Sequence, residues 1–562
     1  MAVRQYIGAR YVTKFYQNSL DPLSTEWESG VFYEALTQVM YNYDTYISRM
    51  DVPDSVGDPA SNPYYWAKTG DYNGQIATIQ NELQLLEERA IVVPQYFGAV
   101  GDGVTDDSDA VIACIDFAKA NNNIVMFTGT YLITKQIKLF DGCKLFGKDA
   151  TVLVQYNNTD TPPDSYNWAC IDCSNCKDID ISFITFTGTG AQSNTYTHCI
   201  FIGGAYASNV NIHHCNFNDV QGEGAIIFFE SHYITAAYNN IKEYTYTGIA
   251  FWDYTDYSTA SHNNIINGHL TSSGHIDRYA IGLCGMTYNL TDWSRPMPEN
   301  LTAEYNYISD DMGEWEGIDA HGGTHIKVSH NTIRNCCIPI AVFTDTDRYF
   351  KVTYAEVDNN VCIMTEANLP SNKLWYSGAF SGEFYQVHDN IFDFVWSAWP
   401  SDPGNLSKFY GVTLGIKRGS FYNNRFNQVP VTAIALNAGH SLNIHDNEVI
   451  NASAMPTLRF IWISEANTYA NVYNNDINAN YPVPSNNPAT LTAEILFRDN
   501  YYATKPNWSD PNGCYPDWCD DTEILTLSGA NGMRVNNYRP SVGDPIGWIR
   551  SGGSWHSLGN LV

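Results

Sequence analysis

One stretch in the middle of the chain, EWEGIDAHGG (residues 314–323), concentrates acidic, histidine and tryptophan side chains between glycines. Glu314, Glu316, Asp319 and His321 are residue types that donate or accept protons in enzymes. Glycoside hydrolysis needs two such groups: one carboxyl acts as general acid, and the other activates water or attacks the sugar. The stretch is therefore the candidate active site.

The geometry of this stretch follows from its alternation of apolar and polar residues. In an extended strand, alternate side chains share one face and lie roughly 7 Å apart. If Ile318 and Ala320 point inward, Asp319 and His321 point outward to solvent. His321 would then orient a carboxylate, or serve as the base in a lyase or phosphodiesterase reaction.

The same stretch runs into HIKVSHNTI (325–333), one copy of a unit that recurs through most of the sequence. In each copy apolar residues alternate, and an Asn lies two places before a closing apolar residue. Successive copies are 23 to 43 residues apart, and short strands with such periods indicate a β-solenoid. An Asn at a fixed turn can hydrogen-bond its stacked neighbour. The predicted anchors are Asn239, Asn263, Asn306, Asn331, Asn359, Asn390, Asn424, Asn447 and Asn475.

The repeat brings further charged residues next to the candidate active site. Asp253 and His321 each lie ten residues before an anchor, so they share a column two coils, or roughly 10 Å, apart. The coil between them carries Asp277 and Arg278, and Asp345 follows downstream. The pool of candidate catalytic groups is thus Glu314, Glu316, Asp319, His321, Asp253 and Asp277.

Substrate contacts are expected from side chains beside this column. Arg278 could hold an acidic sugar or a phosphate group. Trp252 and Trp315 flank the acidic residues, and the largest insertion between repeats carries Tyr288 and Trp293. Their flat rings are suited to covering the apolar faces of sugars.

Two alternatives concern where else chemistry could occur. Glu223 with Glu230 and Asp253, on the preceding coils, forms a second candidate site. The cysteine cluster CIDCSNC (170–176) lacks the second half of a zinc site, so its thiols are expected to be buried in strands. No metal site and no cofactor are therefore expected.

The composition excludes some partners. Acidic residues outnumber basic ones 60 to 30, giving a net charge of −30, which argues against nucleic acid and anionic membranes. The start of the chain has no apolar signal region, and no apolar run is long enough to span a bilayer. The 13 cysteines fit synthesis in a reducing compartment.

One motif carries a family resemblance. FGAVGDGVTDD (97–107) resembles the opening motif of the pectate-lyase-like right-handed parallel β-helix superfamily, which includes polygalacturonases and bacteriophage tailspikes. In that superfamily the motif caps the fold, so its acids are interpreted as structural. A helix from Asp107 to Ala120, with Ala110, Cys114 and Phe117 as its apolar stripe, would close the first coil.

Four regions are predicted. Residues 1–72 form a small domain that docks to a particle or resembles a carbohydrate-binding module. Residues 73–92 form a helical linker, in which apolar residues at heptad spacing suggest a coiled coil. Residues 93–500 form the β-helix with the active or receptor-binding groove. Residues 501–562 form a C-terminal element that caps the solenoid or joins subunits.

This architecture as a whole is similar to that of bacteriophage tailspikes. The resemblance implies a homotrimer in the virion tail, assembled in the host cytoplasm and attached to a tail or baseplate protein. Its implied activity is to bind and depolymerise a host surface polysaccharide, most simply by hydrolysis. The alternatives are a lyase on a uronic-acid polymer, for which calcium is the cofactor left open, a teichoic-acid phosphodiesterase, and a receptor-binding fibre without catalysis.

Overall fold

The computed structural model describes residues 14–15, 26–42, 44–70, 91–155, 169–189, 200–220, 222–268, 279–285, 297–309, 316–346, 349–365, 375–395, 409–429, 432–450, 459–463, 468–478, 485–486, 493–502, 514–515, 518–519, 534–537, 545–551 and 554–559. The chain divides into two compact units, Met1–Ile91 and Val92–Val562. Within the described residues, no helix is both long and apolar enough to cross a lipid bilayer.

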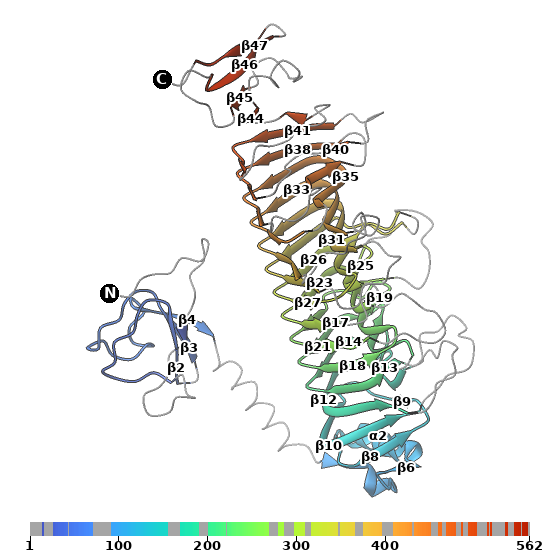
Figure 1. Ribbon diagram of the computed structural model, residues 1–562. Helices are drawn as coiled ribbons and strands as arrows, with labels where there is room; N and C mark the ends of the chain where they lie inside the picture. Colours follow the sequence, from blue (N-terminus) through green and yellow to red (C-terminus); the bar gives the residue numbers. More distant parts are fainter. Residues whose placement is uncertain are drawn as a thin grey trace. The chain divides into compact units, whose positions relative to one another are not determined.

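The second unit is a right-handed parallel β-helix, which confirms the predicted all-β fold class (Figure 1). One coiled sheet runs from β5 (Ile91–Val92) to β43 (Cys514–Tyr515). A typical coil contains three strands: β13 (Ile200–Ala205), β14 (Ser208–His213) and β15 (Asn216–Val220). They pair in parallel with β16 (Gly224–Phe229), β17 (His232–Ala237) and β18 (Asn240–Tyr244) of the next coil.

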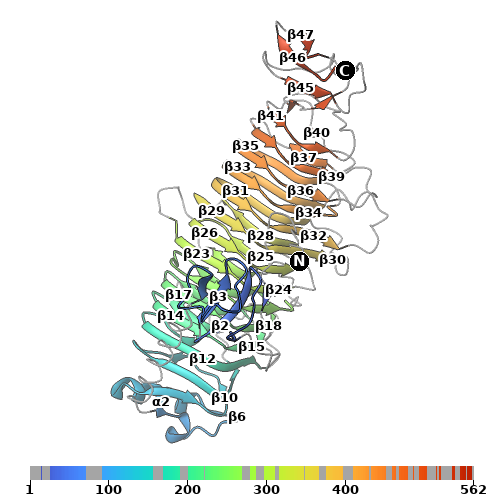
Figure 2. The same cartoon turned by 90° about the vertical axis from the view of Figure 1, so that its left-hand side faces the viewer.

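Stacking of coils produces three long parallel sheets, called here the first, second and third sheets after the order of strands in a coil. The third sheet is seen in Figure 2, where β30 (Val361–Thr365), β32 (Ile391–Val395) and β34 (Arg425–Asn427) follow one another along the column. Inward-pointing side chains stack in register from coil to coil and fill the interior. One such row consists of Ile226, Ile249, Ile281, Ile318 and Ile340, all fully buried.

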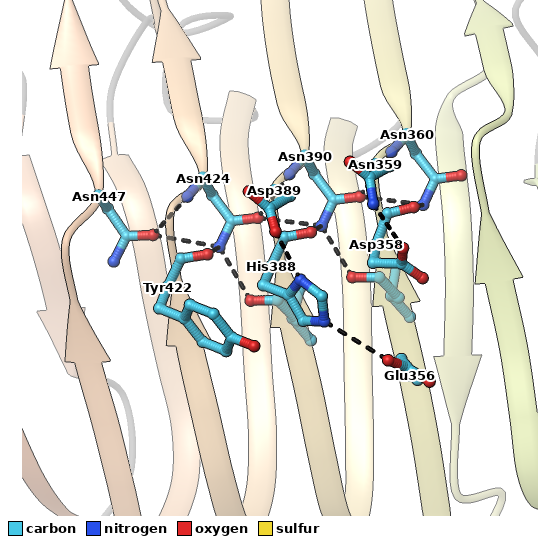
Figure 3. Close-up of polar contacts among 12 residues, drawn as sticks. Glu356, Asp358, Asn359, Asn360, His388, Asp389, Asn390, Tyr422, Asn424 and Asn447 are labelled. Atoms are coloured by element: carbon cyan, nitrogen blue, oxygen red, sulfur yellow. Dashed lines mark hydrogen bonds and ion pairs between the residues drawn. The ribbon is translucent and has the colours of Figure 1, made fainter. Parts of the chain in front are cut away.

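A ladder of buried asparagines occupies the turn between the second and third sheets (Figure 3). The Oδ1 atom of Asn390 accepts hydrogen bonds from the backbone N–H and the Nδ2 of Asn360, at 3.0 and 2.9 Å. Its own Nδ2 donates to Oδ1 of Asn424 at 2.9 Å. The ladder thereby satisfies polar groups that the turn buries. Its members are Asn239, Asn263, Asn306, Asn331, Asn360, Asn390, Asn424, Asn447, Asn475 and Asn500.

One predicted anchor was wrong. The ladder residue in the segment AEVDNNVC is Asn360, whereas the prediction was Asn359. Asn359 occupies the preceding turn position with a left-handed backbone (φ 56°), and its Nδ2 donates to Asp358 instead. Where two asparagines are adjacent, the ladder residue is the one that lies two places before the next apolar core residue, here Cys362.

Aromatic and histidine rings stack on the outside of this turn. Tyr238, His262, Tyr305 and His330 each precede a ladder asparagine, and their ring centroids are 4.6 to 5.0 Å apart. Because neighbouring rings cover one another's faces, the stack exposes mainly ring edges. This arrangement stabilises the coil-to-coil spacing rather than offering flat platforms to a sugar.

The predicted cap is present at the start of the β-helix. The Asp107 carboxylate accepts hydrogen bonds from the backbone N–H groups of Val100 and Gly101, and Asp102 accepts from those of Val104 and Thr105. These bonds fix the loop of the GDGVTDD motif. Its acids therefore hold the cap together, which agrees with their interpretation as structural residues.

The capping helix is α2 (Ser108–Asn121), close to the predicted range. Its buried face consists of Val111, Cys114, Ile115 and Ala118. The predicted inclusion of Phe117 in this face was wrong, because Phe117 is 44% exposed and lies against Phe97 at 5.3 Å between ring centroids. The apolar stripe is shifted by one residue around the helix.

Two small sheets account for the rest of the described structure. In the first unit, β2 (Thr37–Tyr41), β3 (Asp44–Ser48) and β4 (Trp66–Gly70) are antiparallel. Near the C-terminus, β45 (Arg534–Asn537), β46 (Gly547–Ser551) and β47 (Ser554–Ser557) form another antiparallel sheet. The predicted heptad linker falls largely in 71–90, outside the described residues.

Candidate functional site

The candidate site lies where strands of the first sheet end. β19 (Thr247–Trp252), β22 (Tyr279–Cys284), β25 (Glu316–Ala320) and β28 (Ile338–Phe343) pair in parallel, so their last residues form one edge. We call the turns from this edge to the second sheet the strand-end corner. The residues that immediately follow successive strands there are Tyr206, Glu230, Asp253, Gly285, His321 and Thr344.

The centre of the site is an imidazole held between two carboxyl groups. His321 Nε2 lies 3.1 Å from Asp319 Oδ2, and His321 Nδ1 lies 3.5 Å from Asp345 Oδ2. The side chains of His321 and Asp345 are 17% and 15% exposed, whereas that of Asp319 is 6% exposed. Asp319 thus forms the inner side of the cluster, and the other two reach solvent.

The local sequence explains this placement. Ile318 and Ala320 are buried in the interior, so Asp319 points to the outer face, as the alternation predicted. The expectation that Asp319 reaches solvent was wrong, because neighbouring side chains cover it and leave it 4% exposed. Gly317 must lack a side chain, because a Cβ there would lie 2.7 Å from the Pro339 carbonyl oxygen. Gly323 has a left-handed φ of 117° and turns the chain toward the second sheet directly after the cluster.

Burial and charge shift the proton equilibria of the cluster. Burial alone would lower the pKa of His321, but Asp319, Asp345 and Glu316 oppose it and raise the pKa to about 10. Burial raises the pKa of Asp319, an effect that His321 partly offsets. His321 is therefore an imidazolium at neutral pH with both ring nitrogens engaged. This state suits a group that orients carboxylates and does not suit a general base.

Asp319 also has a second, unsatisfied oxygen. Its Oδ1 is buried and makes no hydrogen bond within the described part of the chain. A buried acceptor without a partner is unfavourable by about 1–3 kcal/mol, so its presence needs an explanation. Functional sites are where such groups are retained.

Glu316 and Asp253 lie on either side of this centre. Glu316 begins β25, is 5% exposed, and acts electrostatically on His321. Asp253 is 1% exposed, and its backbone N–H donates to the Gly285 carbonyl at 2.9 Å. The backbone N–H of His321 donates to Cys284 at 2.8 Å, so one coil separates Asp253 from His321, as predicted.

The pKa of the buried Cys284 thiol is affected by the carboxyl groups of Asp319 and Asp253. Its pKa is raised by burial and further by the charges of Asp319 and Asp253. The two carboxyls therefore lie within electrostatic reach of the same sulfur atom, from the coils on either side. This places Asp253 beside the cluster.

Trp252 is the predicted substrate-binding residue that the structure describes. It is 8% exposed and packs in an apolar cluster on the outer face, with Phe229 and Tyr246 at 5.9 and 6.0 Å between ring centroids. Its indole lies against the next coil, at Gly282 and Gly285. A Cβ atom at Gly282 would be 2.9 Å from the Trp252 Nε1, and one at Gly285 would be 2.8 Å from it, so glycine is needed at both positions. The Trp252 indole thus covers the outer surface of the coil that lies between Asp253 and Asp319.

Several predicted site residues lie outside the described residues. They are Glu314, Trp315, Asp277, Arg278, Tyr288 and Trp293. Their roles stay predictions. Of the second candidate site, Glu230 hydrogen-bonds the Tyr206 side chain, which helps to raise the pKa of that phenol. Glu230 and Asp253 are adjacent along the strand-end corner, since the Glu230 N–H donates to the Asp253 carbonyl at 2.8 Å.

A further histidine–carboxylate group lies on the second sheet. His388 lies 2.8 Å from Asp389 and 3.5 Å from Glu356 (Figure 3). The contact recurs two coils later, between His445 and Asp446 at 2.7 Å. A feature repeated with the coil period belongs to the scaffold, so this group is the weaker candidate.

Metal binding receives no support from the geometry of the described residues. Among them, no group of three or more His, Cys, Asp or Glu side chains is arranged to hold a metal ion. Ten cysteines are free and buried, including Cys170, Cys173 and Cys176, in accord with the expectation that these thiols are buried.

Comparison with known proteins bears on the fold. Residues 92–160 match the family model described as rhamnogalacturonase A/epimerase, pectate lyase-like. No curated protein sequence matches the chain. The match covers the predicted cap, and together with the coiled sheet it fits the pectate-lyase-like parallel β-helix superfamily.

Three solved structures with a similar fold are distant in sequence. PfbA, a surface adhesin of Streptococcus pneumoniae, is 14% identical with a TM-score of 0.44, over 84% of this chain and 100% of that one. The pre-mature bacteriophage phi29 gene product 12 is 16% identical with a TM-score of 0.48, over 78% and 59%. The exopolygalacturonase from Thermotoga maritima is 11% identical with a TM-score of 0.40, over 75% and 95%.

Proposed function

We propose that this protein binds a polysaccharide along the strand-end corner and cleaves it at the Asp319–His321–Asp345 cluster. The observation that carries the proposal is a buried Asp319, with a raised pKa and an unsatisfied Oδ1, held beside an imidazolium that a second carboxylate also contacts. The cluster reaches solvent through the side chains of His321 and Asp345, where a hydroxyl-rich ligand can contact it. The family match at the cap is consistent with a glycan-degrading scaffold.

The cluster supplies the two carboxyl groups that glycoside hydrolysis requires. Asp319 Oδ2 and Asp345 Oδ2 contact the two nitrogens of one imidazole ring, so His321 fixes the position of both. The Asp319–His321 pair shares the proton that would pass to the leaving glycosidic oxygen. Asp345, which reaches solvent, would take a proton from the attacking water. His321 acts as the positioning residue for both carboxyl groups.

The wider proposal is a bacteriophage tailspike. Its N-terminal unit (1–72) would dock to a tail or baseplate protein, and the β-helix would act on a host surface polysaccharide as part of a homotrimer. Such a protein would be assembled in the host cytoplasm and carried in the virion. The support is the order of small N-terminal unit, β-helix and small C-terminal sheet along the chain.

A receptor-binding fibre without catalysis is the second candidate. It is favoured by the burial of the carboxyl groups, because Asp319 and Glu316 are only 4% and 5% exposed. Such groups would support the shape of a binding surface and would not touch the scissile bond. A product assay separates the two candidates.

The assay offers purified host-surface polysaccharides to the full-length protein. Hydrolysis releases new reducing ends, a lyase adds an unsaturated absorbance, and a phosphodiesterase releases phosphomonoester. We expect reducing ends without the other two products. Binding without any product would favour the fibre.

A further inference from the structure

The charge of the strand-end corner identifies the class of glycan that fits it. Along the corner, carboxylates project from coil after coil around the proposed cleavage site. Those of the described residues are Glu230, Asp253, Asp256, Glu299, Asp319 and Asp345. A ligand lying along this edge would pass close to several of them.

The basic side chains of the described corner already contact carboxylates of the protein itself. His321 lies between Asp319 and Asp345. His232 contacts Asp256 through Nδ1. Lys351 contacts Glu383 at 2.9 Å, a carboxylate that Lys417 also approaches at 3.7 Å.

Binding of uronate or phosphate needs a cation that is available to the ligand, usually arginine in bidentate geometry. In the described part of the corner, an acidic polymer would have to displace an internal carboxylate from its cation. It would also bring like charges close together in a region of reduced dielectric, which is unfavourable. A neutral polymer meets neither obstacle, and the ammonium group of an amino sugar would be attracted to the carboxylates of the corner.

Exposed tyrosines on the coils before the cluster are suited to a neutral sugar. Tyr206, Tyr233 and Tyr257 are 55%, 56% and 40% exposed and come from three successive coils, Tyr206 and Tyr257 in the strand-end corner and Tyr233 in β17. The hydroxyl of Tyr257 donates to Glu299, and that of Tyr206 bonds Glu230. Tyr233 and Tyr257 stack with their ring centroids 5.2 Å apart, which covers one face of each ring. The exposed ring of Tyr206 is therefore the one best placed to contact the apolar face of a sugar.

We propose that the glycan taken by this corner is neutral or carries amino groups, and that uronic-acid and phosphodiester polymers are excluded. The inference rests on the proposed function, because it assigns the substrate class of that same site. It selects hydrolysis of a neutral or amino-sugar polymer over the lyase and phosphodiesterase alternatives. The Asp345 carboxylate, which reaches solvent beside His321, fits a ligand that brings hydroxyl or ammonium groups.

The test measures binding and cleavage separately with the full-length protein. An array of bacterial polysaccharides graded by charge is probed in EDTA, at about 20 and 200 mM salt, so that no divalent cation bridges like charges. We expect neutral or amino-sugar polymers to bind at least tenfold more tightly than polygalacturonate or glycerol teichoic acid at low salt. We also expect the weak binding of the acidic polymers to strengthen as salt is added.

A matched pair of variants isolates the charge of the corner. Asp256→Asn removes one negative charge from the corner, and Asp116→Asn removes one from the exposed surface of α2. Asp256→Asn is expected to raise affinity for the acidic polymers several-fold at low salt, and Asp116→Asn to leave it unchanged. Equal effects of the two variants would show that total charge, and not the corner, controls binding.

The outcomes separate this inference from the proposed function. Cleavage of polygalacturonate or teichoic acid, with binding that weakens as salt is added, would overturn the inference and leave the cleavage site standing. Binding of neutral polymers without cleavage would support the inference and overturn the catalytic role. Binding of no polymer would overturn both.

Discussion

The ion pair between Asp319 and His321 predicts an alkaline loss of stability. The pKa of His321 is about 10 in the folded protein, against an ordinary value of 6.5. A raised folded-state pKa contributes stability that is fully present below about pH 6.5 and is lost as pH rises through about 10. At about 1.4 kcal/mol per pKa unit, the contribution reaches at most about 5 kcal/mol.

The size of the effect on thermal unfolding follows from the size of the unit. Val92–Val562 spans 471 residues, for which an unfolding entropy of about 1 kcal/mol/K is typical. A loss of about 5 kcal/mol would therefore lower the Tm by about 5 °C. Burial raises the pKa of Asp319 too, so this carboxyl lowers stability in the same direction as pH rises, and the variants below separate the two groups.

The assay compares Tm from pH 6 to 10.5 for the wild type, His321→Gln and Asp319→Asn. The Tm advantage of the wild type over His321→Gln is expected to shrink by about 5 °C between pH 6.5 and 10. In Asp319→Asn the pKa of His321 falls, because its largest favourable partner is gone, and the decline moves toward neutral pH. A wild-type advantage that stays constant across this range would refute the ion-pair account.

Three further substitutions test the scaffold. Asn390→Ala leaves the buried backbone N–H of Asn360 without its acceptor and removes two ladder bonds, so we expect about 4 kcal/mol of destabilisation and a Tm lower by about 4 °C. Gly282→Ala would bring a Cβ within 2.9 Å of Trp252 Nε1; a destabilisation of about 1–3 kcal/mol and altered tryptophan fluorescence are expected, and unchanged fluorescence would contradict this contact. Asp107→Ala removes the acceptor of two cap N–H groups and should cost about 2 kcal/mol while cleavage at 25 °C persists; loss of cleavage in folded protein would give this acid a catalytic role.

The scaffold could be predicted from the sequence because two separate features of the repeat indicate it. The alternation of apolar residues and the recurring asparagine both follow from coil stacking, and the glycine-rich motif marks its start. Prediction failed where two residues competed for one position. Asn359 and Asn360 differ by one place along a turn, and only the packing of the following core residue decides between them.

The site could be predicted only in part. Asp319 and His321 lie in one strand, so alternation was enough to put both on the outer face. Asp345 comes from the turn after the next strand of the first sheet. Its approach to His321 Nδ1 depends on the backbone path of that turn, which the spacing of residues in the sequence does not reveal. The burial of Trp252 depends on glycines one coil away, at Gly282 and Gly285.

The central claim is that the cluster around His321 cleaves a glycan. Its most direct test measures reducing ends released from a polysaccharide that the protein binds, by the wild type, Asp345→Asn and the surface control Asp116→Asn. Loss of a general base typically reduces the rate 10²–10⁴-fold, so we expect at least a 100-fold loss for Asp345→Asn at unchanged binding, and none for the control. Full activity of folded Asp345→Asn would contradict the account.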